Sequence, residues 1–243
     1  MSYLRLILIR HAQSIGNTQA RMEGQQSTPL STCGEQQAQQ LAHALVKANH
    51  APDNRQLAVN CSLSPLLLSH LLPSHLYSSP LVRAHQTATV LSQALEQAGH
   101  SVSLILNESL QEIHPGIFQG LTWQEATIKY PRLCSDLMTS LAWQPVPNAE
   151  SPVAARARAQ QWIDQLLVRH QPGDTIWAVS HAGLMIQLIS TILGCDRTWK
   201  LTIHHTAIFE FWLADTHWQT LTQDRFNPEY WILRRFNDAS HLI

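Results

Sequence analysis

The feature that most constrains the fold is a short apolar run near the start of the chain that ends in two basic residues. Residues 4–9 read LRLILI, and Arg10 and His11 follow directly. A nearly continuous Leu/Ile run is typical of a strand covered on both faces, as in the centre of a parallel sheet. The run is too short for a membrane span or a signal sequence and contains Arg5, so it predicts a buried first strand.

Helix-like and strand-like segments alternate along the rest of the chain, which favours an α/β fold with a mostly parallel sheet. Thr32 and Glu35 have the spacing of a capping box at the first long helix. We expect helices over residues 32–48, 81–98, 152–170 and 182–193, and strands over residues 75–78, 102–106, 175–179, 201–213, 218–221 and 231–236.

Two segments interrupt this alternation. Residues 49–74 have no clear period and contain several prolines, so we interpret them as an irregular insertion. Residues 108–152 are also rich in proline and hold amphipathic pieces over 123–130 and 133–141, which predicts a small cap of helices and loops over one end of the sheet. The length of 243 residues fits a single domain over residues 1–243 that carries both elaborations.

Charge and cysteine content exclude several classes of partner. Sixteen Lys+Arg and seventeen Asp+Glu give a formal net charge of −1, without the basic surplus that nucleic acids or anionic membranes require. Cys33, Cys61, Cys134 and Cys195 are far apart and form no CxxC pair, which argues against a disulfide framework or a structural zinc site. This pattern favours a reducing cytoplasm, and the oligomeric state stays open.

Basic residues follow three of the predicted strands. Arg10 and His11 follow the first strand, Arg83 lies just beyond the second, and His181 follows the strand near residue 179. One strand-end histidine is more often structural than catalytic, but ligands bind at the carboxyl ends of parallel strands, so three such junctions predict one shared site. Both histidines are expected at or just before helix starts, which favour anions, and arginine forks suit bidentate contact with a phosphate dianion.

The residues around these junctions resemble the histidine phosphatase superfamily, the phosphoglycerate-mutase-like group, and in particular its phosphatase branch. The resemblance is specific because four motifs occur in order and cover most of the chain, and the tail over residues 231–242 is similar to that of the phosphatase branch. The motifs are LIRHAQS (8–14) with Asn17, Arg21 and Gly24, YSSPLVRAHQTA (77–88), LQEIHPGIFQG (110–120) and VSHAG (179–183).

This resemblance implies a three-layer α/β/α sandwich and a metal-independent phosphomonoesterase that needs no cofactor and acts on a small-molecule phosphate ester. His11 would attack phosphorus and become phosphohistidine, because imidazole is nucleophilic near neutral pH. Basic residues would neutralise the phosphoryl oxygens during transfer. The implied phosphate contacts are Arg10, Asn17, Arg83, His181 and Ala182.

Glu112 is the candidate for protonating the leaving alkoxide and later activating the water, because it occupies the acidic position of the Leu-x-Glu…Gly pattern. Glu108, four residues earlier, is the rival, but we interpret it as a solvent-exposed carboxylate at a strand end. Glu150 resembles an acidic element of the family. It is better explained as a helix N-terminal carboxylate beside an N-cap, Ser151.

Two positions depart from the family pattern. Ala12 replaces the usual glycine after the nucleophile, which is tolerable if its φ is negative. Glu23 stands before Gly24 where the family more often has a neutral polar residue. A carboxylate that faces phosphate would be repulsive, so Glu23 either points away or selects the substrate, together with Gly24.

Within the family, the chain could transfer the phosphoryl group to water or, as phosphoglycerate mutases do, to a second acceptor. A mutase needs further cations around its cap, but Ile113 follows Glu112, and between residues 111 and 148 only His114, Lys129 and Arg132 are basic. Hydrolysis is therefore favoured. The apolar cap residues would suit a substrate with an apolar or ring portion, and they suit the core of the cap at least as well: Ile113, Ile117, Phe118, Trp123 and Trp143.

Two other classes of protein remain as alternatives. A non-catalytic phospholigand-binding module could use the same pocket, although such a protein would be expected to lack one of the catalytic residues. A metal-dependent hydrolase would need a ligand motif such as His-Glu-x-x-His, which is absent from the sequence. His204 and His205 are adjacent on a predicted strand and would point to opposite faces, so we expect no metal.

Overall fold

The computed structural model describes residues 3–47, 72–195, 197, 199–214 and 229–243, and its core is a six-stranded sheet in the order β3-β2-β4-β1-β5-β6. The parallel strands are β1 (Leu4–Arg10), β2 (His75–Ser78), β3 (Leu104–Leu106) and β4 (Thr175–Ser180). Strand β5 (Ile208–Leu213) is antiparallel to β1, and β6 (Trp231–Asp238) is antiparallel to β5. The predicted α/β class with a mostly parallel sheet is confirmed.

Strand β4 lies between β1 and β2, and its register with both shows that the carboxyl ends of the three strands are aligned. Arg10 pairs with Ser180, and Ser78 pairs with Val179. All six residues of β4 are buried, as expected for a strand with neighbours on both edges and helices on both faces. The three strand ends therefore meet at one edge of the sheet.

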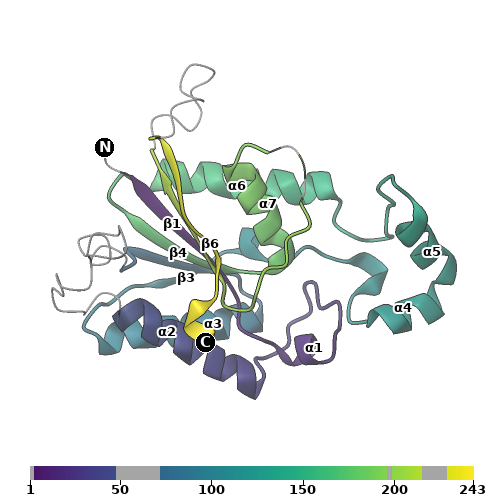
Figure 1. The fold of residues 1–243 in the computed structure, drawn as a ribbon, viewed down its shortest axis with the longest axis horizontal. Coiled ribbons are helices and arrows are strands. Elements are labelled where there is room, and N and C mark those ends of the chain that lie inside the picture. Colours follow the sequence, from purple (N-terminus) through teal and green to yellow (C-terminus); the bar gives the residue numbers. More distant parts are fainter. Residues whose placement is uncertain (1–2, 48–71, 196, 198, 215–228) are drawn as a thin grey trace.

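Helices cover both faces of the sheet (Figure 1). Helices α2 (Thr32–Lys47) and α3 (Val82–Gln97) pack on one face, and α6 (Pro152–Arg169) and α7 (Ala182–Ile192) pack on the other. Side chains alternate along β1, so Ile7 and Ile9 pack in the core between the sheet and α2 and α3. Leu6 and Leu8 pack in the core on the opposite face, against α6 and α7. This arrangement confirms the three-layer sandwich.

The predicted cap lies to one side of the sandwich (Figure 1). It contains helices α4 (Trp123–Lys129) and α5 (Pro131–Thr139) and the short 3-10 turns η2 (Glu108–Leu110) and η3 (Gly116–Phe118). Phe118, Ala126 and Cys134 form a small core of their own. Thr122 caps α4 together with Glu125, so the cap has its own local order.

Some boundaries differ from the sequence expectations. Residues 201–207 are not part of a strand, so β5 begins only at Ile208. The hydroxyl of Ser31 accepts a hydrogen bond from the N–H of Gly34 at 3.0 Å, so Ser31 and not Thr32 caps α2. A short helix that was not predicted, α1 (Ile15–Thr18), follows the first motif, and a 3-10 turn, η6 (Ser240–Leu242), ends the chain.

Several sequence expectations fall outside the described residues. These are the strand over 218–221, most of the insertion over 49–74, and Cys61. The cysteines that are described, Cys33, Cys134 and Cys195, form no disulfide within the described residues. None of the described helices combines the length and the apolar character needed to cross a bilayer.

Candidate active site

The ends of the strands and the loop that carries Glu112 surround a pocket of about 330 Å³. This volume is at the small end of the range for small-molecule sites. The rings of His11 and His181 lie 4.9 Å apart between their centroids, at the ends of β1 and β4. The pocket is lined by Arg10, His11, Asn17, Arg21, Met22, Glu23, Gly24, Arg83, Glu112, Ile113, Pro115 and Gly183.

His11 is buried and held in one tautomer. Its Nδ1 lies 2.7 Å from the carbonyl oxygen of Ala12, and Arg83 Nε donates to its Nε2 at 3.3 Å. A carbonyl oxygen only accepts, so the proton is on Nδ1 and the lone pair is on Nε2. Burial, followed by the charges of His181, Arg83 and Arg10, lowers the pKa of His11 well below 6.5. The ring is therefore neutral. Ala12 does not have a positive φ, so it fits where glycine is usual.

His181 is the N-cap residue of α7, as predicted, and is fully buried. One ring nitrogen, Nε2, lies 2.8 Å from the hydroxyl of Ser79. The other, Nδ1, is buried and has no hydrogen-bond partner among the described residues. Burial, then the charges of Arg83 and Arg10, lower the pKa of His181 well below 6.5. The helix start nearest to His11 is that of α1, four residues later, where Ser14 is the N-cap residue.

The two arginines use their nitrogens differently. Arg10 Nη1 donates to the carbonyl of Ile203 at 2.5 Å, while its buried Nε has no partner among the described residues. Arg83 donates through both Nη atoms, to the carbonyls of Gly24 and Gln26, at 2.7 Å each. Together with the bond to His11, these contacts use three of the five N–H groups of Arg83 and hold a loop in place, and two N–H groups are left for the predicted phosphate contact.

Glu112 lies in the pocket wall, against the start of α7. Its carboxylate accepts hydrogen bonds from the backbone N–H groups of Gly183 at 3.0 Å and Leu184 at 2.9 Å, and from that of Ile113 at 2.8 Å. Two of the first three amides of α7 are thus directed at Glu112. Ala182 carries the remaining one, the amide that the sequence assigned to phosphate.

The two rival carboxylates lie outside the lining of the pocket. Glu108 accepts a hydrogen bond from Gln111 on the exposed side of the loop. Glu150 forms an ion pair with Arg158, with an N–O distance of 2.7 Å, and Arg158 also donates to the carbonyls of Ser109 and Gln111. Ser151 does cap α6 as expected. Glu150, however, positions the loop that carries Glu112 through Arg158.

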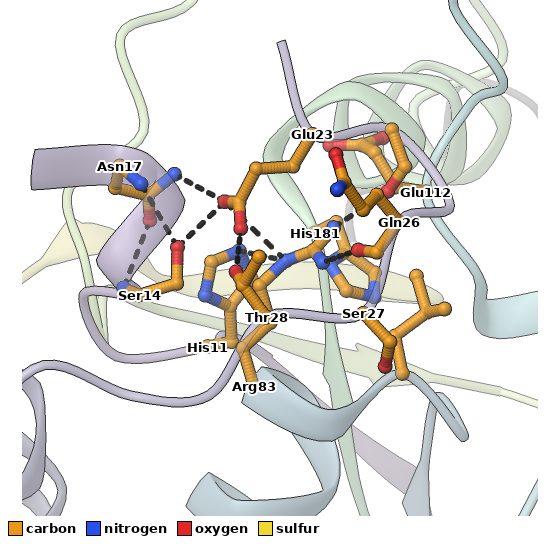
Figure 2. A network of polar contacts seen from close by, with 12 residues as sticks. His11, Ser14, Asn17, Glu23, Gln26, Ser27, Thr28, Arg83, Glu112 and His181 are labelled. Atoms are coloured by element: carbon orange, nitrogen blue, oxygen red, sulfur yellow. Dashed lines mark hydrogen bonds and ion pairs between the residues drawn. The ribbon is translucent and has the colours of Figure 1, made fainter. Parts of the chain in front are cut away.

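Glu23 points toward the pocket, which answers one question the sequence left open (Figure 2). Its carboxylate accepts hydrogen bonds from Ser14 Oγ at 2.6 Å and Asn17 Nδ2 at 2.8 Å, and from the hydroxyl of Thr28. Arg83 Nε lies 3.8 Å from Glu23 Oε2. A second carboxylate, buried and opposite in charge to Arg10 and Arg83, therefore lines the pocket together with that of Glu112.

Gly24 has a structural reason to be glycine. Its φ is +51°, and a Cβ on Gly24 would lie 2.0 Å from the Cδ of Pro115. The carbonyl of Gly24 accepts from Arg83. Gly24 therefore brings the loop after Glu23 against the loop that carries Glu112, while Arg83 holds it in place.

His205 belongs to the site, although the sequence did not point to it. Its Nε2 lies 3.0 Å from Asn17 Oδ1, and its ring centroid is 6.2 Å from that of His11. Burial, then the charges of Arg10 and His204, lower the pKa of His205 to about 4. His205 lies in a turn just before β5, not on a strand. Because β5 is antiparallel to β1, its beginning meets the same edge as the end of β1, and this rule could have identified the residue.

Of the large apolar cap residues, only Ile113 lines the pocket. Phe118 is buried in the core of the cap, and Ile117 packs against it. Trp123 and Trp143 are 42% and 59% exposed. The cap core therefore explains more of these residues than a substrate-binding surface does.

One group of described residues could hold a metal ion, and it is remote from the pocket. The ligand atoms of His75, His170 and Asp174 all lie within 4.8 Å of one another. His75 begins β2 and Asp174 directly precedes β4, so the group lies at the amino ends of these strands. The pocket is at their carboxyl ends, and the residues that line it include no cysteine and, besides His11, no histidine.

Comparisons with known proteins give matches over most of the chain. The family model "Histidine phosphatase superfamily (branch 1)" matches residues 6–53 and 63–224. Glucosyl-3-phosphoglycerate phosphatase of Mycolicibacterium vanbaalenii is 30% identical over 204 residues, covering 80% of this chain and 76% of that protein. Phosphoglycerate mutase-like protein 4 of Arabidopsis thaliana is 24% identical over 243 residues, covering 100% of this chain and 88% of that protein.

A solved structure shows the same fold. Phosphoserine phosphatase from Entamoeba histolytica, in complex with 3-phosphoglyceric acid, has a TM-score of 0.69 and 23% sequence identity. The match covers 99% of this chain and 100% of that one.

Proposed function

The chain belongs to branch 1 of the histidine phosphatase superfamily, and we propose that it is a metal-independent phosphomonoesterase that works through a phosphohistidine on His11. The observation that carries this proposal is the fixed tautomer of His11. Its Nδ1 proton is directed at the carbonyl of Ala12, so Nε2 keeps a lone pair in a pocket with two arginines. A neutral imidazole held in this way is a ready nucleophile for phosphorus.

In the first step, Nε2 of His11 forms a bond to phosphorus while the bond from phosphorus to the ester oxygen breaks. The leaving alkoxide takes a proton from Glu112, which enters this step as the carboxylic acid. Glu112 lies in the wall of the same pocket as His11, so one small ester can reach both groups.

In the second step, water attacks the phosphohistidine. Glu112, now a carboxylate, removes a proton from the water as the new P–O bond forms and the N–P bond breaks. Inorganic phosphate leaves, and His11 returns to its neutral form. The same carboxyl group thus serves as acid and then as base.

Charge on the transferring phosphoryl group is the main target for electrostatic stabilisation. Arg10 Nε and His181 Nδ1 are buried without partners among the described residues, and an oxyanion would supply the missing acceptors. Asn17, with a second amide hydrogen, and the N–H of Ala182 complete our proposed set of contacts. Arg83 contributes its charge, its contact with His11 and the N–H group that each Nη has left.

Water, rather than a second phosphate acceptor, is the proposed destination of the phosphoryl group. A mutase must also bind a further acidic group of its substrate, which requires a cation that is free to do so. Besides Arg10, Arg83 and the nucleophile His11, the only basic residue that lines the pocket within the described chain is Arg21. Arg21 is paired with Glu125 at 2.9 Å, so its charge is already balanced.

The substrate class that fits is a small phosphate ester. The volume of about 330 Å³ leaves room for a compact organic group beside the phosphate. Met22, Ile113 and Pro115 supply apolar wall there.

The direct test is hydrolysis of p-nitrophenyl phosphate in excess chelator by the wild type and by His11→Ala. We expect activity that survives the chelator and falls roughly a thousandfold or more in the variant, as when a nucleophile is removed. His43→Ala is the matched control, because His43 is exposed on α2 and its loss should leave the rate unchanged.

Two other outcomes would contradict the proposal. Loss of activity in chelator, restored by a divalent metal, would indicate a metal-dependent hydrolase. Binding of inorganic phosphate without hydrolysis of any phosphate ester would indicate a binding module. Trapping ³²P on the wild type but not on His11→Ala, in an acid-labile and alkali-stable form, would identify the intermediate as phosphohistidine.

A further inference from the structure

A carboxylate inside an anion-binding pocket needs an explanation, and Glu23 is such a group. Its side chain is only 4% exposed, and it lines the same pocket as His11 and Arg83. The inference below rests on the proposed function, since it assumes that a phosphate group enters this pocket.

Hydrogen bonds and local packing fix the side chain of Glu23 in one position. Both carboxylate oxygens accept hydrogen bonds: Oε2 from Ser14 and Asn17, and Oε1 from Thr28 (Figure 2). Gly16 leaves the space that the side chain fills, because a Cβ on Gly16 would lie 2.4 Å from Glu23 Cδ. Glu23 is therefore held at this place by groups of the protein itself.

These contacts argue against the simplest alternative, a counter-charge for a cationic substrate. Three protein donors already bind the carboxylate, and Arg83 Nε lies 3.8 Å away. Of the roughly four acceptor positions of the carboxylate, at most one is left for a substrate ammonium group. The effect to consider is instead electrostatic, because the negative charge of Glu23 offsets one positive charge of the pocket.

The charges that face the pocket cancel before any ligand enters. Arg10 and Arg83 carry the positive charge, and Glu23 and Glu112 carry the negative charge. The three histidines that face this region, His11, His181 and His205, have lowered pKa values and are neutral near pH 7. Arg21 is balanced by Glu125, and Arg158 by Glu150.

A phosphate dianion would therefore bring two uncompensated negative charges into a buried site, which is strongly unfavourable at low dielectric. Protons taken up from solvent remove this penalty. One proton goes to Glu112, which must be protonated to act as the acid. With a neutral amide in place of Glu23, the same pocket would hold one positive charge more and would need one proton fewer.

We propose that Glu23 makes phosphate binding proton-coupled, so that the wild-type pocket takes up one proton more with each phosphate group than a pocket with glutamine at this position. The extra proton is shared in a hydrogen bond between the carboxylate of Glu23 and a phosphoryl oxygen of the ligand. Glu23 thereby selects the more protonated form of the ligand and directs the enzyme toward acidic conditions.

The test compares the wild type with Glu23→Gln, using inorganic phosphate as the probe. Calorimetric titrations in buffers of different ionisation enthalpy count the protons taken up on binding. We expect the wild type to take up about one proton more, and the ratio of the two Kd values to change about tenfold per pH unit. The titration of phosphate itself is common to both proteins and cancels in the ratio.

Two further variants serve as a matched control and as a second way to displace Glu23. Glu96→Gln removes an exposed carboxylate of α3 and should leave the proton count unchanged. Gly16→Ala would push the Glu23 side chain from its place, so it provides a second route to the same result if Glu23→Gln fails to fold.

Equal proton counts for the wild type and Glu23→Gln would overturn the proposal. A selective loss of phosphoethanolamine hydrolysis in Glu23→Gln, with p-nitrophenyl phosphate unaffected, would also overturn it and identify Glu23 as a partner for a substrate cation. Both results leave hydrolysis by the wild type intact, whereas failure of the proposed function would remove it, so the two failures are distinguishable.

Discussion

Glu112 occupies the space that a side chain at position 183 would fill. A Cβ built on Gly183 would lie 2.6 Å from Glu112 Oε1, far inside van der Waals contact. The absence of a side chain lets the amides of Gly183 and Leu184 donate directly to the carboxylate. The position of Glu112, the acid in our proposal, is thus fixed by a glycine that is 71 residues away in the sequence.

Gly183→Ala should displace Glu112 without destabilising α7, so it distinguishes an effect on Glu112 from an effect on the helix. The new methyl group displaces the carboxylate, while alanine is at least as good a helix residue as glycine. We expect a tenfold or larger fall in kcat, to an order of magnitude, on an alkyl phosphate and an unchanged or higher Tm. A fall in Tm of several degrees would show instead that the helix, and not the acid, is damaged.

Glu112→Gln should affect poor leaving groups most. An alkoxide needs a proton, whereas p-nitrophenolate needs little. We expect kcat on an alkyl phosphate to fall roughly a hundredfold or more and kcat on p-nitrophenyl phosphate to fall much less, measured side by side. Equal losses on both substrates would refute the role of Glu112 as the acid.

Arg158→Gln should loosen the loop that carries Glu112. Arg158 donates to Ser109 and Gln111 and pairs with Glu150, so its loss leaves several polar groups without partners. We expect about 2 kcal/mol of destabilisation, measured by urea unfolding, and a larger loss of kcat on alkyl phosphates than on p-nitrophenyl phosphate. Arg132→Gln, at an exposed position of α5, should change stability by less than about 0.5 kcal/mol.

Stability should fall in acid because of His11 and His181. Their folded pKa values are well below 6.5, while an unfolded histidine titrates near about 6.5. Below that pH the unfolded chain binds more protons than the folded one, so the free energy of unfolding decreases as pH falls. Above it, these two groups contribute no slope.

Urea unfolding at about pH 7.5 and about pH 5.5 measures this dependence, with a limit of about 1.4 kcal/mol per pH unit for each histidine. His181→Asn should give a shallower decrease than the wild type, since one of the two groups is gone. Equal slopes for both proteins would contradict the assignment of His181 as a buried neutral ring.

The strand ends could be predicted from the sequence because they depend on one rule. Arg10 ends β1, and His11 and His181 directly follow the parallel neighbours β1 and β4, while Arg83 lies in the first turn of the helix after β2. The side of the sheet on which ligands bind follows from strand direction alone. Local apolar patterning was therefore sufficient to bring these four residues together.

Other features depend on contacts between loops, which no local pattern encodes. The fork of Arg83 turns to the carbonyls of Gly24 and Gln26, and no spacing in the sequence indicates that choice. Glu23 enters the pocket because Gly16 leaves room for it. His205 was missed because residues 201–213 were expected to be one strand, so the turn before β5 was not recognised.

The pairing of β1 with β4 has a consequence for how this protein is made. Arg10 and Ser180 are neighbours in the sheet, although most of the chain lies between them. His11 leaves the ribosome long before β4 and the His181 that follows it, so a nascent chain cannot assemble the proposed phosphate site until β4 is inserted beside β1. A fragment that ends between residues 84 and 180 contains His11 and Arg83 but lacks His181, so the proposed site is incomplete in it.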